Sequence, residues 1–183
     1  MAANEAIICE RCSNSPPPFN RLCALFSYQP PIIRLIGSLK FGRQLYPATL
    51  FGKLLAEAIT QRWYQHKNLP QVIIPVPLHS KRYRQRGYNQ AAELSKPLAK
   101  YLDLPLDLEL CSRIRNTSPQ ARLSKNKRTR NLSSAFAVNM TENYNHVALV
   151  DDVVTTGSTV RALSLVLRAA GVELIDIWCV ARA

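Results

Sequence analysis

A run of apolar residues that leads into two adjacent acids constrains the fold of this chain more than any other feature. Residues 147–150 read Val-Ala-Leu-Val, and Asp151 and Asp152 follow directly. A continuous apolar run of this kind is typical of a strand that is buried on both faces of a parallel sheet. The two carboxylates therefore emerge at the carboxyl edge of the sheet, which is where open α/β folds bind their ligands.

The short loop after the two acids predicts a phosphate site. It offers hydroxyl and backbone N–H donors at the expected start of a helix, a combination that suits a phosphate group. Carboxylates can hold the sugar hydroxyls or a hydrated Mg²⁺ beside it. The pattern therefore fits a sugar phosphate, although a buried strand and a capped helix without any ligand would use the same residue types. The phosphate-binding candidates are Thr155, Thr156, Gly157, Ser158 and Thr159.

A first basic segment, residues 77–86, contains no acid and follows a second predicted buried strand at 72–76. Because parallel strands end at one edge of a sheet, this segment should open beside Asp151. Its turn and its arginines suit a pyrophosphate, since the planar arginine fork binds phosphate oxygens bidentately. The pyrophosphate-binding candidates are Leu78, His79, Lys81, Arg82, Arg84 and Arg86. His79 fits a hydrogen-bonded loop histidine equally well.

A second basic segment, residues 113–130, also lacks acids and begins with Arg113 and Arg115. It could close over a bound polyphosphate and exclude water from the reacting centre. A solvated basic loop is the alternative. The whole chain holds 24 Lys and Arg against 12 Asp and Glu, a formal net charge of +12. This balance predicts polyanionic partners, either phosphate-rich ligands or nucleic acid.

Helical and strand patterns alternate along most of the chain, which predicts an α/β domain with a mostly parallel sheet flanked by helices. The domain is expected to span residues 31–183. Helices are predicted at 31–41, 47–66, 87–102 with an interruption near Pro97, 123–132 and 158–170. Strands are predicted at 72–76, 106–114, 135–138, 147–150 and 174–180. Residues 1–30 are rich in proline, which predicts an irregular appendage.

The acids and the hydroxyl loop resemble the signature of the type I phosphoribosyltransferases, which bind 5-phosphoribosyl-1-pyrophosphate with Mg²⁺. The resemblance implies that Asp151 and Asp152 hold the ribose hydroxyls and that residues 155–159 hold the 5′-phosphate. It also implies a type I phosphoribosyltransferase-like fold with a hood near residues 31–66. The magnesium ion would be bound through the donor rather than by a protein cage.

Four further motifs are similar to the ComF family, whose relatives include GntX. They are Leu-Ile-x-x-Leu-Lys-Phe-Gly at 35–42, Pro-Leu-His with Arg-Gly-Tyr-Asn-Gln within 77–90, Arg-x-Arg-x-Thr-x-x-Gln-x-x-Leu at 113–123 and Arg-x-x-Asn-Leu-x-x-Ala-Phe at 128–136. The resemblance runs from about Phe19 to the C-terminus. ComF proteins are phosphoribosyltransferase-like and are linked in many bacteria to DNA uptake in natural transformation.

The ComF resemblance also implies a small N-terminal zinc finger made of two Cys-x-x-Cys knuckles. This chain has one such pair, Cys9 and Cys12, and Cys23 alone cannot complete the four ligands of a structural zinc. We therefore expect a vestigial or truncated finger within residues 1–30 and no bound zinc, with a zinc shared between chains as the alternative. The odd total of five cysteines argues against a disulfide framework.

Two functions are consistent with these features. The first is a phosphoribosyltransferase of unknown acceptor, with Asp151, Asp152, Arg113 and Arg115 as catalytic candidates. The second is a non-enzymatic competence module that uses the pocket as a sensor or scaffold. Such a module could bind single-stranded DNA, with Tyr83 and Tyr88 stacking on bases, or the helicase and recombination proteins of DNA uptake.

The expected location is the cytoplasm, without membrane insertion. The sequence contains no apolar stretch long enough to span a bilayer. Its first residues lack the basic and apolar regions of a signal peptide.

Overall fold

A parallel four-stranded sheet forms the centre of the protein. The computed structural model describes residues 10–42, 44–115, 134–140 and 142–183. The strand order is β1-β6-β5-β2, and every neighbouring pair is parallel. The strands are β1 (Arg21–Ser27), β2 (Val72–Pro75), β5 (His146–Val154) and β6 (Leu174–Arg182). The predicted α/β class with a mostly parallel sheet is confirmed.

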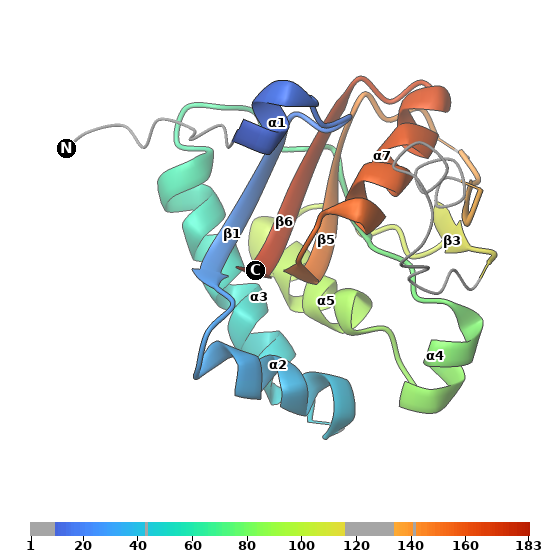
Figure 1. Ribbon diagram of the computed structural model, residues 1–183. Coiled ribbons are helices and arrows are strands. Elements are labelled where there is room, and N and C mark those ends of the chain that lie inside the picture. The colour runs from blue at the N-terminus through green and yellow to red at the C-terminus, as the bar shows by residue number, and fades with distance from the viewer. Residues whose placement is uncertain (1–9, 43, 116–133, 141) are drawn as a thin grey trace.

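Helices cover both faces of this sheet (Figure 1). They are α1 (Glu10–Asn14), α2 (Ile32–Phe41), α3 (Tyr46–Ala58), α4 (Ser80–Arg86), α5 (Gln90–Leu102) and α7 (Ser158–Ala169), with a π-helix at Ile59–Trp63 after α3. Helices α3 and α5 pack on one face and α7 on the other, while α2 and α4 lie at the carboxyl end of the strands. A small antiparallel sheet, β3 (Cys111–Arg113) with β4 (Phe136–Val138), packs beside α7.

The central strand β5 is buried on both faces, as predicted for residues 147–150. Val147 and Leu149 pack in the core under α7, whereas Ala148 and Val150 pack in the core under α3 and α5. This division follows from the two-residue period of a strand, which sends successive side chains to opposite faces. All four side chains are fully buried, which explains why the run contains no polar residue.

Several predicted boundaries are wrong, each for a local reason. Strand β5 continues to Val154, because its pairing with β6 extends through the acids. The helix expected at 87–102 begins at Gln90, where Asn89 caps it, and it continues through Pro97 without the expected interruption. The helix expected at 47–66 changes to π-geometry after Ala58.

Two further expectations differ more strongly from the structure. Residues 21–27, expected to be irregular, form β1 and pair with β6. Of the strand expected at 106–114, only Cys111–Arg113 is a strand, while Leu106 forms an isolated bridge with Ile73. The helix expected at 123–132 lies outside the described residues.

A buried polar network stabilises the amino-terminal end of the sheet, opposite the strand ends discussed below. Asp176 of β6 accepts a hydrogen bond from the Tyr64 hydroxyl at 2.5 Å and lies 2.8 Å from His146 Nε2. Arg21 lies 3.4 Å from its other oxygen, and Trp178 Nε1 donates to the Tyr64 hydroxyl at 3.1 Å. A buried carboxylate is stable only when it is paired in this way.

Candidate functional site

The carboxyl ends of β2 and β5 bring the two predicted halves of the site together. Pro75 is in register with Val150, and the Val76 N–H donates to the Val150 carbonyl at 2.8 Å. The chain leaving β2 and the acids of β5 therefore lie on neighbouring strands at one edge. This arrangement agrees with the prediction that residues 77–86 open beside Asp151.

The two acids contact different parts of this edge. Asp151 lines a small hollow of about 50 Å³ together with the loop after β5. Asp152 lies 2.6 Å through Oδ2 from the ammonium nitrogen of Lys40, which belongs to α2. Each acid also accepts a hydrogen bond from the backbone N–H of the next residue. Asp151 Oδ1 accepts from the Asp152 N–H at 2.8 Å, and Asp152 Oδ1 accepts from the Val153 N–H at 2.9 Å.

Burial of the Asp151 carboxyl raises its pKa well above the usual value. The negative charge of Asp152 raises this pKa further, and Lys40 opposes the shift. A carboxylate whose charged form is disfavoured in this way gains from a cation or a hydrogen-bond donor placed beside it. A bound cation or hydrogen-bond donor would therefore stabilise the charged form of Asp151.

The hydroxyl loop has the geometry expected of an anion site. Gly157 adopts the left-handed conformation, with φ of +73°, and α7 begins at the next residue. The hydroxyls of Thr156 and Ser158 lie 2.7 Å apart, and no acid occupies the first turn of α7. The helix dipole and the N–H groups of this turn therefore face no competing negative charge from the helix itself. Residues 155–159 all line the hollow beside Asp151.

The first basic segment forms a short helix, α4, rather than an open loop. His79 caps it through Nδ1, which accepts from the Lys81 N–H at 3.1 Å. This contact shows a local structural role for His79. Helix α4 has no buried residue, so the apolar spacing that reveals most helices is missing from residues 80–86.

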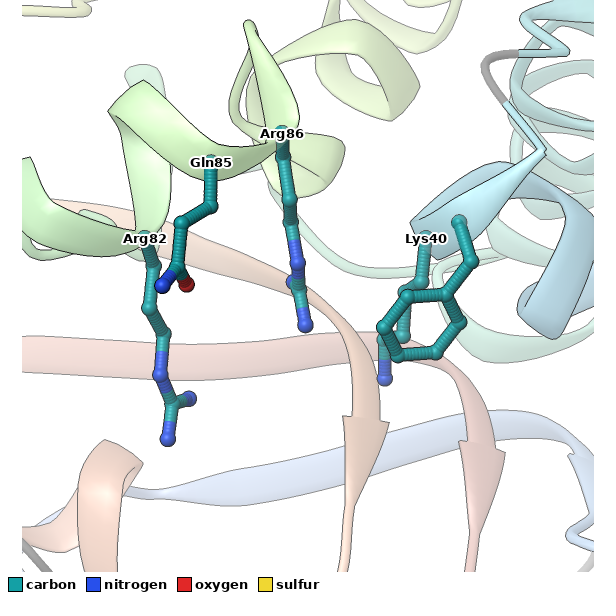
Figure 2. Close-up of a pocket in the computed structure, with 5 residues that line it drawn as sticks. Lys40, Arg82, Gln85 and Arg86 are labelled. Carbon is teal, nitrogen blue, oxygen red and sulfur yellow. The ribbon is translucent and has the colours of Figure 1, made fainter.

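A cationic cavity of about 450 Å³ lies between α2 and α4 (Figure 2). Arg82 and Arg86 share one face of α4 because they are four residues apart. Lys81 and Arg84, also predicted to bind pyrophosphate, are exposed and lie outside the cavity lining. The residues that line the cavity are Lys40, Phe41, Arg82, Gln85 and Arg86.

Arg86 links this cavity to the acids. Its guanidinium lies 5.3 Å from the centre of the Phe41 ring and donates to Gln90 Oε1 at 2.7 Å. Burial lowers the pKa of Arg86, Asp152 opposes that shift and Arg82 adds to it. The direction of these effects shows that Arg86 lies within electrostatic reach of both an acid and a second arginine.

Arg113 approaches the same edge from β3. Burial lowers its pKa, the positive charge of Arg82 lowers it further, and Asp151 opposes the shift. The structure therefore brings Arg82 and Asp151 within electrostatic reach of Arg113, although the three residues come from three segments. Arg115 is exposed, and residues 116–133 of the second basic segment lie outside the described residues.

Sequence reasoning missed Lys40 and Gln85 as site residues. It left Phe41, in the same Leu-Lys-Phe-Gly motif as Lys40, open between the hood and the core. Leu39 is fully buried, as a core residue should be, whereas 78% of Phe41 is exposed. A lysine next to a phenylalanine within a matched motif is the sequence signal that could have identified Lys40.

The described residues include no group of three or more His, Cys, Asp or Glu side chains that could hold a metal ion. Both oxygens of Asp152 have partners in the protein, Lys40 and the Val153 N–H. Cys12 Sγ accepts from Arg161 at 3.7 Å, and Cys9 lies outside the described residues.

The fold and this edge define an open α/β protein whose candidate site combines paired acids, a hydroxyl loop and a cationic cavity. DNA utilization protein YhgH of Salmonella typhimurium is 38% identical over 182 residues, 99% of this chain and 80% of that protein. Competence protein F of Haemophilus influenzae is 39% identical over 179 residues, 96% of this chain and 78% of that protein. The chain belongs to the family of these proteins, the ComF/GntX family.

Solved structures with a similar fold include two phosphoribosyltransferases. A hypoxanthine phosphoribosyltransferase from Staphylococcus aureus is 16% identical with a TM-score of 0.42, covering 74% of this chain and 63% of that one. A purine phosphoribosyltransferase from Pyrococcus horikoshii is 17% identical with a TM-score of 0.39, covering 76% of this chain and 85% of that one. No protein-family model matches the chain. None of the helices in the described ranges is long and apolar enough to cross a membrane.

Proposed function

We propose that this protein binds 5-phosphoribosyl-1-pyrophosphate with Mg²⁺ at the carboxyl edge of its sheet. The observation that carries the proposal is the position of Asp151. It lines one hollow with the hydroxyl loop and lies within electrostatic reach of Arg113. Candidate groups for a phosphate, for a sugar hydroxyl and for a second phosphate group are thus adjacent, which supports binding of this donor.

Each part of the donor has a matching part of the site. Asp151 and Asp152 accept hydrogen bonds from the ribose hydroxyls, and residues 155–159 bind the 5′-phosphate. Arg82 and Arg113 hold the pyrophosphate, because guanidinium groups bind phosphate oxygens through paired hydrogen bonds. Bound Mg²⁺ would supply further neutralisation of the pyrophosphate charge. Lys40 keeps the Asp152 carboxylate oriented, since it lies 2.6 Å from Oδ2.

The reaction that this arrangement supports is a group transfer at ribose C1. The bond from C1 to the pyrophosphate oxygen breaks with its electron pair, and an acceptor nucleophile forms the new bond and releases its proton. The arginines stabilise the charge that develops on the leaving group. The nearby carboxylates stabilise the positive charge on the ribose. Positioning and charge therefore carry the catalysis, without a covalent intermediate on the protein.

The names of the relatives support a role in the uptake or use of DNA. Under this proposal, partners include single-stranded DNA and the helicase or recombination proteins of DNA uptake. A non-enzymatic DNA-binding module stays the alternative. Tyr83 is 51% exposed on α4 and suits base stacking. Tyr88 does not, since its hydroxyl donates to the Leu39 carbonyl at 2.5 Å and its ring is half-buried.

Calorimetric titration with 5-phosphoribosyl-1-pyrophosphate and Mg²⁺, followed by an assay of pyrophosphate release with candidate acceptors, tests the proposal. We expect one donor site per chain. Asp151→Asn should weaken donor binding at least about tenfold, which is about 1.4 kcal/mol. Asp103→Asn is the matched control, because Asp103 ends α5 with a φ of +53° that asparagine also adopts. Absence of donor binding to the unaltered protein, or equal affinities of the two variants, would refute the proposal.

A further inference from the structure

We propose that Tyr88 is a positioning residue for Asp152. It holds the end of helix α2 so that Lys40 lies against the Asp152 carboxylate. This role rests on the proposed function, in which that carboxylate binds a ribose hydroxyl. The Tyr88 hydroxyl does not touch the acid and acts on it through Leu39 and Lys40.

The Tyr88 hydroxyl binds the last turn of α2. It donates to the Leu39 carbonyl at 2.5 Å, although the two residues are 49 positions apart in the chain. Carbonyl groups in the last turn of a helix lack partners within the helix, so a side-chain donor can satisfy them. The buried Leu39 side chain is held by non-directional apolar packing, whereas the hydrogen bond requires one orientation of its carbonyl. The contact therefore fixes the orientation of this turn.

Tyr88 itself lies in a turn that is anchored to the sheet. Gly87, just before it, ends α4 in the left-handed conformation with a φ of +85°. Asn89, just after it, caps α5 through Oδ1, and its Nδ2 donates to the Val76 carbonyl at 3.0 Å. The Val76 N–H in turn donates to the Val150 carbonyl of β5 at 2.8 Å. The backbone that carries the Tyr88 ring is therefore fixed relative to β5.

Lys40 transmits this position to the acid. It follows Leu39 directly, and its ammonium nitrogen lies 2.6 Å from Oδ2 of Asp152. An ion pair of this kind costs the entropy of holding a long, flexible side chain in one geometry. A backbone held by Tyr88 lowers that cost, because Lys40 then begins from one fixed point. Loss of the Tyr88 contact should therefore loosen the carboxylate that the donor uses.

Labelling of lysines with acetic anhydride, followed by mass spectrometry, tests this role without the donor. An ammonium group held against a carboxylate reacts slowly, so Lys40 should react more slowly than the exposed Lys53 of α3. Tyr88→Phe keeps the ring and removes the hydroxyl. We expect it to speed the labelling of Lys40, relative to Lys53, at least about threefold.

Tyr64→Phe is the matched control for this labelling. It also removes a hydroxyl that donates to a buried acceptor, but at the opposite end of the sheet. It lowers stability without touching α2, so it should change the labelling of Lys40 by less than about twofold. A general loss of stability would speed the labelling in both variants.

Donor titration shows whether Tyr88 acts through Lys40. Tyr88→Phe should weaken donor binding about threefold to tenfold, the value of one hydrogen bond. The same change made in Lys40→Met should have less than about a twofold effect, since the lysine that Tyr88 positions is then absent. A merely structural role would weaken binding equally in both chains.

The two measurements separate this role from the proposed function. Equal labelling of Lys40 in Tyr88→Phe and Tyr64→Phe would overturn the role of Tyr88. Equal weakening of donor binding with and without Lys40 would also overturn it. Faster labelling in Tyr88→Phe, with no donor binding to the unaltered protein, would support the hold of Tyr88 on Lys40 and refute the proposed function.

Discussion

The ammonium nitrogen of Lys40, on helix α2, lies 2.6 Å from Oδ2 of Asp152, near the end of strand β5. Only 22% of the lysine side chain and 10% of the aspartate side chain are exposed, so water screens this ion pair less than a surface pair. The contact joins the cavity beside α2 to the acids proposed to bind ribose.

Loss of Lys40 should destabilise the protein through Asp152. Lys40→Met leaves a buried carboxylate without its cation, and we expect the free energy of unfolding to fall by about 2–3 kcal/mol. Asp152→Asn in the same chain should restore part of this loss, because the amide carries no charge. Urea unfolding of both single variants and the double variant measures the coupling. Simple additivity of the two effects would show that the ion pair contributes nothing.

The pKa of Asp151 predicts an unusual dependence of stability on pH. It is raised in the folded state, so the native protein retains a proton that the unfolded chain releases above pH ~4. Stability should therefore fall as the pH rises from that value through the folded pKa. Asp151→Asn removes this loss of stability and should raise the melting temperature at pH 7. The expected rise is about 2–4 °C for each kcal/mol added to the free energy of unfolding. Thermal melts at pH 4 and pH 7 provide the test, and a variant less stable than the unaltered protein at pH 7 contradicts it.

Two helical glycines should respond oppositely to alanine. A Cβ at Gly52 would lie 2.7 Å from Pro97 Cγ, where α3 crosses α5, so Gly52→Ala should cost about 1–3 kcal/mol. A Cβ at Gly37 in α2 would meet no atom within 4 Å. Gly37→Ala should therefore stabilise the protein by about 0.5–1 kcal/mol through lower backbone entropy in the unfolded chain. Chemical denaturation of both variants measures the contrast, and equal effects would rule out the close approach of α3 and α5.

The buried network at the amino-terminal end of the sheet should depend on the Tyr64 hydroxyl. Tyr64→Phe removes its hydrogen bond to Asp176 and leaves Trp178 Nε1 without an acceptor. Groups buried without partners cost about 1–3 kcal/mol. Tyr144→Phe is the control, because its hydroxyl bonds to Glu142 near the surface and should change stability by less than about 0.5 kcal/mol. Similar melting temperatures for the two variants would contradict the role of the network.

The parts of the site carried by β2, β5 and α7 could be predicted from the sequence. Residues 147–150 are apolar because both faces of β5 are buried, and the hydroxyl loop follows where the strand ends. Local patterns of this kind are visible in a sequence because they arise from burial and from the geometry of one element. The start of α7 at Ser158 was predicted for the same reason.

The parts carried by α2, α4 and β1 were less accessible to sequence reasoning. The pairing of Lys40 with Asp152 depends on how distant segments pack, which no local pattern encodes. Helix α4 buries no residue, so it lacks apolar periodicity. Strand β1 is an edge strand whose residues are only partly buried, and it follows a run of prolines that favours an irregular segment.

The central claim is that the hydroxyl loop binds the phosphate of a sugar pyrophosphate donor. Titration of 5-phosphoribosyl-1-pyrophosphate with Mg²⁺ into Thr156→Glu tests it most directly, because Thr156 is exposed and the new carboxylate would repel a phosphate there. Thr60→Glu adds the same charge on the π-helix, just before Tyr64 and the polar network. We predict at least about tenfold weaker binding for Thr156→Glu and less than about a twofold change for Thr60→Glu. Donor binding that is equal in both variants, or absent from the unaltered protein, would contradict the claim.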